Sequence, residues 1–186
     1  AFNEQLDEDS VIVHAAGGLP GDLHKLWKSK SYKDYHSEYA FSCMGYEIAG
    51  ALGVKLASPE KEVYTFVGDG SYLMLNHELL TSIQLEQKIT VVLLNNHGYQ
   101  CIHNLQKGCG SESFGNEFRS AKGDYLEVDF VANAKSFGAK TFEVGNIKDL
   151  PTAIEAAKKE TQSCLIYMEI EPSTPLPGYS WWDVPV

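Results

Sequence analysis

The sequence predicts an α/β fold with a doubly wound, mostly parallel sheet of about six strands and helices on both faces. Short apolar runs that are typical of buried strands alternate with segments of helical periodicity along most of the chain. Turns rich in glycine or asparagine follow several of these runs, as expected where parallel strands end. With 186 residues, 44% of them hydrophobic, the chain is long enough for one well-buried domain. We therefore expect one domain over residues 11–170, preceded by a linker or helix end (1–10) and followed by a proline-rich aromatic tail (171–186).

The predicted strands are short and bounded by turn-forming residues. Most are apolar, and the second is a brief stretch within a polar and aromatic connection. In chain order, the predicted strands cover residues 11–15, 35–38, 63–67, 89–94, 140–144 and 164–170. The predicted helices cover residues 22–27, 41–57, 76–87, 99–106, 129–137 and 147–161. Because helices separate most of the strands, the connections resemble the crossovers that parallel sheets require.

The helix at 41–57 is unusually rich in small residues. Apolar residues recur from Met44 with the helical spacing of about 3.6 residues. Pro59 stops this helix because proline disfavours helical backbone in the residue before it. Each glycine inside a helix costs about 1 kcal/mol relative to alanine. We therefore expect close packing against the sheet or another chain to offset that cost.

Glycine and proline also mark the later helices. Gly138 follows one predicted helix, and Pro151 lies in the first turn of the next, where its missing N–H removes no hydrogen bond. Residues 107–125 show no periodic pattern and are predicted to form a long loop. Loops of this length in compact domains are usually functional or mobile.

Two segments of the first third allow both a functional and a structural interpretation. Gly17 and Gly18, after the first strand, could present backbone N–H groups to an anion, or could form a plain tight turn. His36 and Glu38 could form a polar pair near a site, or could belong to a solvated loop. The residue types alone leave these alternatives open.

Charge and cysteine usage exclude several classes of protein. The formal net charge of −10 argues against nucleic acid as a partner, because a phosphate backbone attracts a basic surface. No run approaches the roughly 18 to 20 apolar residues that a membrane-spanning helix needs, so we expect no membrane insertion. The cysteines form no CxxC pair, which fits a reduced, cytoplasmic setting. They are Cys43, Cys101, Cys109 and Cys164.

The stretch from Gly68 to Gly98 carries the clearest chemical signal. A GDG turn follows the third predicted strand, and Asn95-Asn96 follows the next strand after an interval that leaves room for one helix. Both turns should therefore lie at the carboxyl ends of neighbouring parallel strands, where open α/β sheets bind ligands. At that edge, Asp69 and the Asn96 side chain are within reach of one hard cation.

This pattern resembles the diphosphate-binding motif of the thiamine diphosphate enzymes, in which GDG is followed by NN at this interval. The resemblance implies that thiamine diphosphate and Mg²⁺ bind here. Asp69, the Asn96 side-chain oxygen and the Gly98 carbonyl would ligate the metal, because Mg²⁺ prefers a shell of oxygen ligands. Gly70 and Ser71, at the start of the following helix, would offer backbone N–H groups and a hydroxyl to phosphate.

The resemblance also extends to the opposite end of the cofactor. It implies that the carbonyl of Ser42 accepts a hydrogen bond from the aminopyrimidine and that Met44 wedges between the two rings, bending the cofactor so that its own amino group can take the C2 proton. Taken alone, Met44 is instead a core residue at helical spacing. The cofactor-binding residues implied in this way are Gly17, Gly18, Leu19, Ser42, Met44, Gly68, Asp69, Gly70, Ser71, Asn96, Gly98 and Tyr99.

Within the family, several segments are similar to the trihydroxycyclohexanedione hydrolases of inositol catabolism. They are AAGGLPGDLHKLW, YHSEYAFSCMGYEIAGALG, VGDGSYLMLNHELLTS, CIHNLQ, SFGNEFR and GYSWWDV. The resemblance implies a cytoplasmic enzyme that opens a small cyclic 1,2-diketone by C–C cleavage with water, giving 5-deoxyglucuronic acid. It also implies a homo-oligomer for the full-length protein.

One component of the family has no counterpart in this sequence. Thiamine diphosphate enzymes activate the cofactor with a glutamate from a pyrimidine-binding domain of the same or a neighbouring subunit. We therefore expect this chain to be the diphosphate-binding domain alone, with little or no activity and no catalytic residue that can be named. The alternatives are a subunit of a 2-oxoacid decarboxylase, an acetolactate-synthase-like carboligase domain, or a non-enzymatic binding or assembly module.

Overall fold

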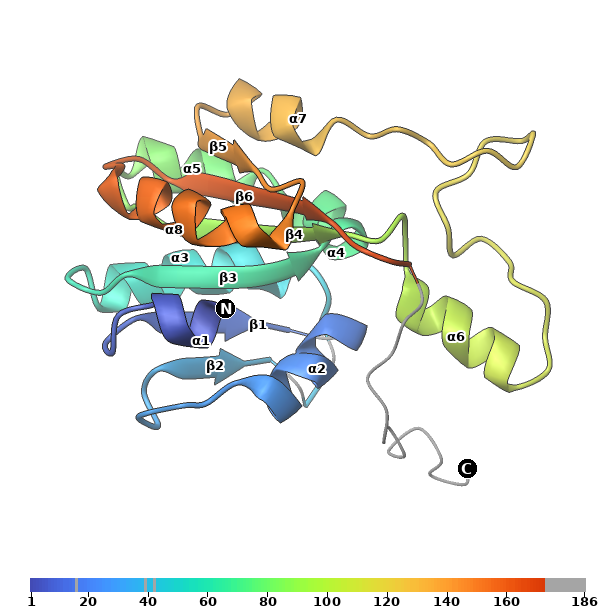
Figure 1. The fold of residues 1–186 in the computed structure, drawn as a ribbon, viewed down its shortest axis with the longest axis horizontal. Coiled ribbons are helices and arrows are strands. Elements are labelled where there is room, and N and C mark those ends of the chain that lie inside the picture. Colours follow the sequence, from blue (N-terminus) through green and yellow to red (C-terminus); the bar gives the residue numbers. More distant parts are fainter. Residues whose placement is uncertain (16, 39, 42, 173–186) are drawn as a thin grey trace.

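The sheet has six strands, and every pair of neighbours is parallel. The computed structural model describes residues 1–172 except 16, 39 and 42. The strands are β1 (Val11–His14), β2 (Tyr35–Ser37), β3 (Val63–Gly68), β4 (Thr90–Asn95), β5 (Lys140–Glu143) and β6 (Cys164–Glu169). Their order is β2-β1-β3-β4-β6-β5 (Figure 1). This arrangement confirms the predicted α/β fold.

The strand order reverses direction beside β1. The chain runs from β1 outward to β2 and then returns to form β3 on the other side of β1. In open parallel sheets, ligands bind outside the carboxyl ends of the strands at such a switch point. The glycine turn after β1 and the GDG turn after β3 therefore flank the position where a ligand is expected.

Helices cover both faces of the sheet and enclose two hydrophobic cores. They are α1 (Phe2–Gln5), α2 (Gly18–Leu26), α3 (Tyr46–Ala57), α4 (Asp69–Leu75), α5 (Glu78–Gln84), α6 (Gln100–Gly108), α7 (Phe130–Ser136), the 3₁₀ turn η1 (Ile147–Asp149) and α8 (Leu150–Lys159). One core holds α3, α5 and α7, and the other holds α2 and α8. Figure 1 shows α6 standing away from the sheet.

The central strands are largely apolar because both of their faces are covered. On β3, Val63 and Val67 pack into the α3 core, whereas Tyr64 and Phe66 pack into the α8 core. Successive side chains of a strand point to opposite faces, so a strand buried on both sides needs apolar residues at nearly every position. This is why the predicted strand carried a continuous apolar run.

Several helix boundaries differ from the prediction. The helix expected at 76–87 is α5, which is shorter at both ends, and a separate helix, α4, covers Asp69–Leu75 before it. The helix expected from residue 41 begins only at Tyr46. Gly45 before it has the left-handed φ of 89°, which interrupts helical backbone. In the other direction, α2 starts at Gly18 rather than Asp22.

At the start of the chain, α1 packs on the sheet, with the Phe2 and Phe66 ring centroids 4.8 Å apart. Most of the predicted aromatic tail (171–186) lies outside the described residues. Within the described part, no helix combines the length and apolar character needed to cross a bilayer.

Candidate functional site

The two motif turns meet at one edge of the sheet. Strands β3 and β4 pair in parallel register with Gly68 opposite Leu94, so Asp69 and Asn96 follow neighbouring strand ends. The carboxylate of Asp69 is fully buried. Its Oδ1 accepts a hydrogen bond from the Gly70 N–H at 2.9 Å, and its Oδ2 accepts one from the Gly98 N–H at 2.7 Å. The Asp69 side chain therefore ties the GDG turn to the turn after β4.

The side-chain amide of Asn96 points at the same place. One of its terminal atoms lies 2.8 Å from the Gly98 carbonyl oxygen and 3.0 Å from Asp69 Oδ1. With the amide nitrogen in this position, both contacts are hydrogen bonds; with the amide turned over, three oxygens face one another. Adjacent oxygen ligands of an octahedral Mg²⁺ lie about 2.9 Å apart, so these positions suit such a cation.

The chemistry of these donors also fits a hard cation. Among the described residues, no cluster of three or more His, Cys, Asp or Glu side chains could hold a metal ion, so a site here depends on the amide and carbonyl oxygens as well as on Asp69. Burial raises the pKa of the Asp69 carboxyl, because a buried negative charge lacks the solvation of water. A bound cation would offset that cost.

The conformation of the turn after β4 is set by the first asparagine of the motif. Asn95 Oδ1 accepts a hydrogen bond from the His97 N–H at 3.1 Å, and Asn95 Nδ2 donates one to the Tyr167 hydroxyl at 2.8 Å. His97 adopts the left-handed φ of 62°, which a non-glycine residue rarely adopts without support. Asn95 thus holds the backbone that presents Asn96 and Gly98.

Two glycines of the site allow close approach of other groups. A Cβ on Gly70 would lie 2.5 Å from the ring of Tyr99, the predicted cofactor-binding residue that follows Gly98. Gly98 has a φ of 137°, and a Cβ there would lie 2.8 Å from Cα of Glu117. No larger residue fits at either position without movement, which explains the glycines of the motif.

Ser71 has a different set of contacts from the one expected. Its hydroxyl donates to Glu47 Oε1 at 2.6 Å and accepts from the Gly45 N–H at 2.8 Å. The hydroxyl proton is therefore committed to Glu47, and a contact from Ser71 to phosphate would come from its backbone N–H. Asp69, Gly70 and Ser71 form the first turn of α4, where backbone N–H groups have no carbonyl partner within the helix.

The remaining predicted residues lie on two other segments. Gly17 precedes α2 with a φ of 114°, and Gly18 and Leu19 form the first turn of that helix at the end of β1. Met44 is partly exposed and directly precedes the left-handed Gly45. Ser42 lies outside the described residues. Gly68 ends β3 and caps α4.

A cluster of polar side chains is centred on Glu117, which belongs to the SFGNEFR segment but was not predicted as a site residue. This residue lies in the long loop between α6 and α7, and it forms an antiparallel bridge with Gly98 in the turn after β4. Its carboxylate accepts hydrogen bonds from Arg119 Nε at 2.9 Å and from the Tyr125 hydroxyl at 2.6 Å. The Gln100 amide, which also donates to the Asn96 carbonyl at 3.0 Å, lies 3.5 Å from Glu117 Oε1. The loop is thereby fastened to the motif.

This cluster should make the stability of the loop depend on pH. The hydrogen bonds from Arg119 and Tyr125 lower the pKa of Glu117 from 4.5 to about 2, with Arg119 the largest cause. The ionised Glu117 carboxylate therefore stabilises the folded chain at pH values above the ordinary pKa of 4.5. This stabilisation is lost as the pH falls towards 2. Urea unfolding should therefore show Glu117→Gln less stable than wild type at pH 6, with roughly half or more of the difference gone by pH 3.

The control for this experiment is Glu112→Gln, which removes an exposed glutamate from the same loop. It should match wild type at both pH values. A stability difference for Glu117→Gln that stays constant between pH 6 and pH 3 would contradict the assignment of the effect to the ionised carboxylate.

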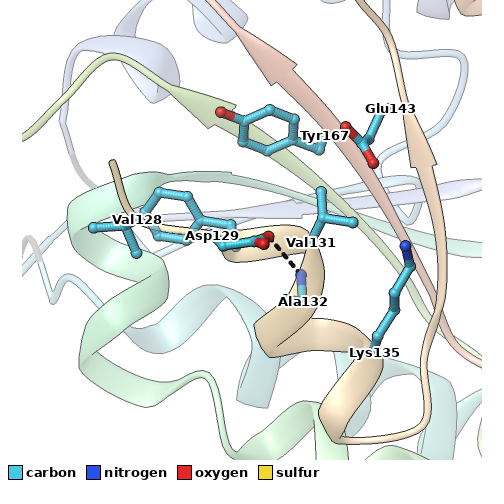
Figure 2. A pocket seen from close by; sticks show the side chains of 8 residues that line it. Val128, Asp129, Val131, Ala132, Lys135, Glu143 and Tyr167 are labelled. Atoms are coloured by element: carbon cyan, nitrogen blue, oxygen red, sulfur yellow. Dashed lines mark hydrogen bonds between the residues drawn. The ribbon is translucent and has the colours of Figure 1, made fainter. Parts of the chain in front are cut away.

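A surface hollow of about 340 Å³ lies elsewhere, between α7, β5 and β6 (Figure 2). It is lined by Val128, Asp129, Phe130, Val131, Ala132, Lys135, Glu143 and Tyr167. None of the predicted cofactor-binding residues lines it. Tyr167 connects it to the motif, because its hydroxyl accepts a hydrogen bond from Asn95. The geometry of the turns, rather than this hollow, therefore locates the candidate cofactor site.

Comparison with known proteins identifies the family that this chain resembles. A family model described as "Thiamine pyrophosphate enzyme, C-terminal TPP binding domain" matches residues 15–168. The chain is 52% identical over 193 residues to "3D-(3,5/4)-trihydroxycyclohexane-1,2-dione hydrolase 2" of Bacillus cereus, covering 100% of this chain and 30% of that protein. It is 51% identical over 187 residues to "3D-(3,5/4)-trihydroxycyclohexane-1,2-dione hydrolase" of Bacillus licheniformis, covering 100% and 29%.

A solved structure shares the fold. Benzoylformate decarboxylase from Polynucleobacter necessarius superposes with a TM-score of 0.82 over 94% of this chain and 33% of that one, at 19% identity. At this identity the likeness concerns the fold alone. The chain spans about 30% of the length of the hydrolases that it matches. The match over residues 15–168 confirms the family predicted from the motif: the chain belongs to the thiamine pyrophosphate enzymes and matches their C-terminal cofactor-binding domain.

Proposed function

We propose that this chain binds the diphosphate end of thiamine diphosphate together with Mg²⁺, in an enzyme that opens a cyclic 1,2-diketone by hydrolytic C–C cleavage. The observation that carries the proposal is the convergence of Asp69, Asn96 and Gly98 at the ends of β3 and β4. The identity of 51–52% to trihydroxycyclohexanedione hydrolases supports the choice of reaction.

The metal-binding role rests on the oxygen ligands that Asp69, Asn96 and Gly98 can offer at one place. Asp69 would supply a carboxylate, Asn96 its side-chain oxygen and Gly98 its carbonyl, and the metal would neutralise the diphosphate charge. Backbone N–H groups in the first turns of α4 and α2 would bind the phosphate oxygens. They belong to Gly70 and Ser71 in α4, and to Gly18 and Leu19 in α2.

The remaining roles concern the rings of the cofactor. Met44 would pack between the two rings, Ser42 would accept a hydrogen bond from the aminopyrimidine, and the Tyr99 ring would pack against Gly70. When bound, thiamine diphosphate supplies a carbon nucleophile and an electron sink. A glutamate from a pyrimidine-binding domain of the same or a neighbouring subunit would complete the site. The proposal extends to a full-length enzyme that is cytoplasmic and homo-oligomeric.

The proposal is tested with the full-length protein. Isothermal titration should show thiamine diphosphate binding that requires Mg²⁺ and disappears in excess EDTA. The loaded enzyme should consume trihydroxycyclohexane-1,2-dione and release an open-chain acid, while carbon dioxide release from pyruvate stays at background. Decarboxylation of pyruvate without ring opening would instead support the decarboxylase alternative, and lack of cofactor binding would reject both.

A further inference from the structure

One buried acid near the site has no role in the proposed binding of the cofactor. Glu47 lies in the first turn of α3, and only 1% of its surface is exposed. Its Oε1 accepts the hydroxyl hydrogen bond of Ser71 at 2.6 Å, and its Oε2 accepts the Gly45 N–H at 2.9 Å. Burying a carboxyl group is unfavourable unless hydrogen bonds compensate. Both oxygens of Glu47 have such a partner.

The partners of Glu47 belong to the two segments that would hold opposite ends of the cofactor. Ser71 lies in the first turn of α4, beside Asp69 and Gly70 at the diphosphate end. Gly45 directly follows Met44, the residue expected between the rings. The Gly45 N–H also donates to the Ser71 hydroxyl at 2.8 Å, so Gly45, Ser71 and Glu47 form a closed triangle of hydrogen bonds.

The turn that contains Met44 and ends at Gly45, called here the Met44 turn, is also bonded to a second carboxylate. Glu38 Oε1 accepts the Phe41 N–H at 3.2 Å, and Glu38 Oε2 accepts the Cys43 N–H at 2.6 Å. Glu38 thus fixes the beginning of the turn, and Glu47 fixes its end. The mutual repulsion of Glu38 and Glu47 is one of the smaller causes that raise the pKa of Glu47, after its burial.

Glu47 is in turn anchored to the sheet. Its backbone carbonyl accepts the hydroxyl hydrogen bond of Thr65 on β3 at 3.0 Å, and the Thr65 side chain is fully buried. A Cβ on Gly45 would lie 3.1 Å from Cβ of Met74 on α4, so the turn also packs closely against that helix. One residue therefore connects β3, α3, α4 and the Met44 turn.

We propose that Glu47 is a positioning residue that sets the distance and orientation of the Met44 turn relative to the diphosphate helix α4. Through this link, the position of the diphosphate on α4 would determine the angle between the two rings of the cofactor. The inference rests on the proposed function, because it assigns to Met44 and α4 the two ends of thiamine diphosphate. Glu47 itself touches neither the cofactor nor the substrate in this role.

The test separates positioning from plain stabilisation in the full-length holoenzyme. The variants are Glu47→Ala, Glu47→Gln and Ser71→Ala, with Glu60→Gln as a control at an exposed turn glutamate. The melting temperature of each variant is measured first. The Kd of thiamine diphosphate with Mg²⁺ and the exchange rate of the cofactor C2 proton at saturating cofactor are then measured below the lowest melting temperature of the set.

We expect Glu47→Ala to slow C2 exchange by on the order of tenfold at saturating cofactor, because small misplacements of reacting groups are costly. Its Kd should rise by only a few fold, since the metal and phosphate contacts remain. Glu47→Gln should recover part of the rate, because its amide oxygen can still accept the Gly45 N–H. The double variant Glu47→Ala/Ser71→Ala should be no slower than Glu47→Ala, because the two residues act through one link.

Two outcomes would overturn the inference. If Glu47→Ala lowers the melting temperature but exchanges the C2 proton at the wild-type rate, Glu47 serves stability alone. If Glu47→Ala does not fold, the same conclusion follows from wild-type exchange in Glu47→Gln and Ser71→Ala together. Failure of the wild-type protein to bind thiamine diphosphate is distinguishable from both, since it rejects the proposed function itself.

Discussion

Replacing Asp69 with asparagine should weaken Mg²⁺-dependent binding of thiamine diphosphate by at least about 100-fold while leaving the chain folded. Asp69 is the only acid in the set of oxygens formed with Asn96 and Gly98. An asparagine keeps the size of the side chain but removes the negative charge that attracts the metal. It also leaves one of the two backbone N–H groups without its acceptor, at a cost of about 1–3 kcal/mol. Calorimetric titration with Mg²⁺ and the melting temperature measure the two effects separately.

Asp129→Asn is the matched control for this experiment. Asp129 also accepts a backbone hydrogen bond, from the Ala132 N–H at 2.7 Å, but it caps α7 at the hollow shown in Figure 2. Its replacement should lower stability slightly and leave cofactor affinity unchanged. Wild-type affinity in Asp69→Asn would rule out a metal ligand at position 69.

Replacing Gly98 with alanine should disrupt both the turn after β4 and the loop that covers it. The φ of 137° is strained for alanine, and the new Cβ would lie 2.8 Å from Cα of Glu117, close to backbone that cannot move independently. We expect a destabilisation of about 2 kcal/mol or more, because overpacking and backbone strain add. Cofactor binding should be lost, since the Gly98 N–H holds Asp69 and its carbonyl faces Asn96. Urea unfolding and calorimetry measure these results.

Gly110→Ala separates the effect of backbone strain from the effect of the close contact with the loop. Gly110 has a φ of 78°, but a Cβ there would meet no atom within 4 Å. Gly110→Ala should lower the free energy of unfolding by roughly 1–2 kcal/mol, because an alanine in left-handed backbone is strained. The affinity for the cofactor should not change. If Gly98→Ala behaves like Gly110→Ala in both measurements, the close contact with the loop has no functional importance.

The sequence predicted the fold well because its strands and crossovers are encoded locally. The continuous apolar runs of β3 and β4, and the glycine and asparagine turns after them, indicated both the parallel sheet and the edge where the motif lies. The break between α4 and α5 was missed because Asp69 and Gly70 indicate a turn as readily as the start of a helix.

The connections among the site residues could not be predicted in the same way. Glu47 is a glutamate in a helix of small residues, and nothing in its local sequence indicates that it contacts Ser71, which lies 24 residues away. Likewise, Glu117 meets Gly98 only because a long aperiodic loop folds back. Such contacts depend on how distant segments pack, whereas periodicity reports only on a residue's own element.

The parallel pairing of every strand also has a consequence for the order of folding. The closest strand pair in the sequence, β1 with β2, already joins residues 23 apart, and β4 with β6 joins residues 74 apart. No hairpin can nucleate this sheet, and sheets built from distant segments fold slowly. The hydrogen bond between Asn95 and Tyr167 requires β6 to be in place. During synthesis, therefore, the turn that presents Asn96 reaches its final support only after the last strand of the sheet has left the ribosome.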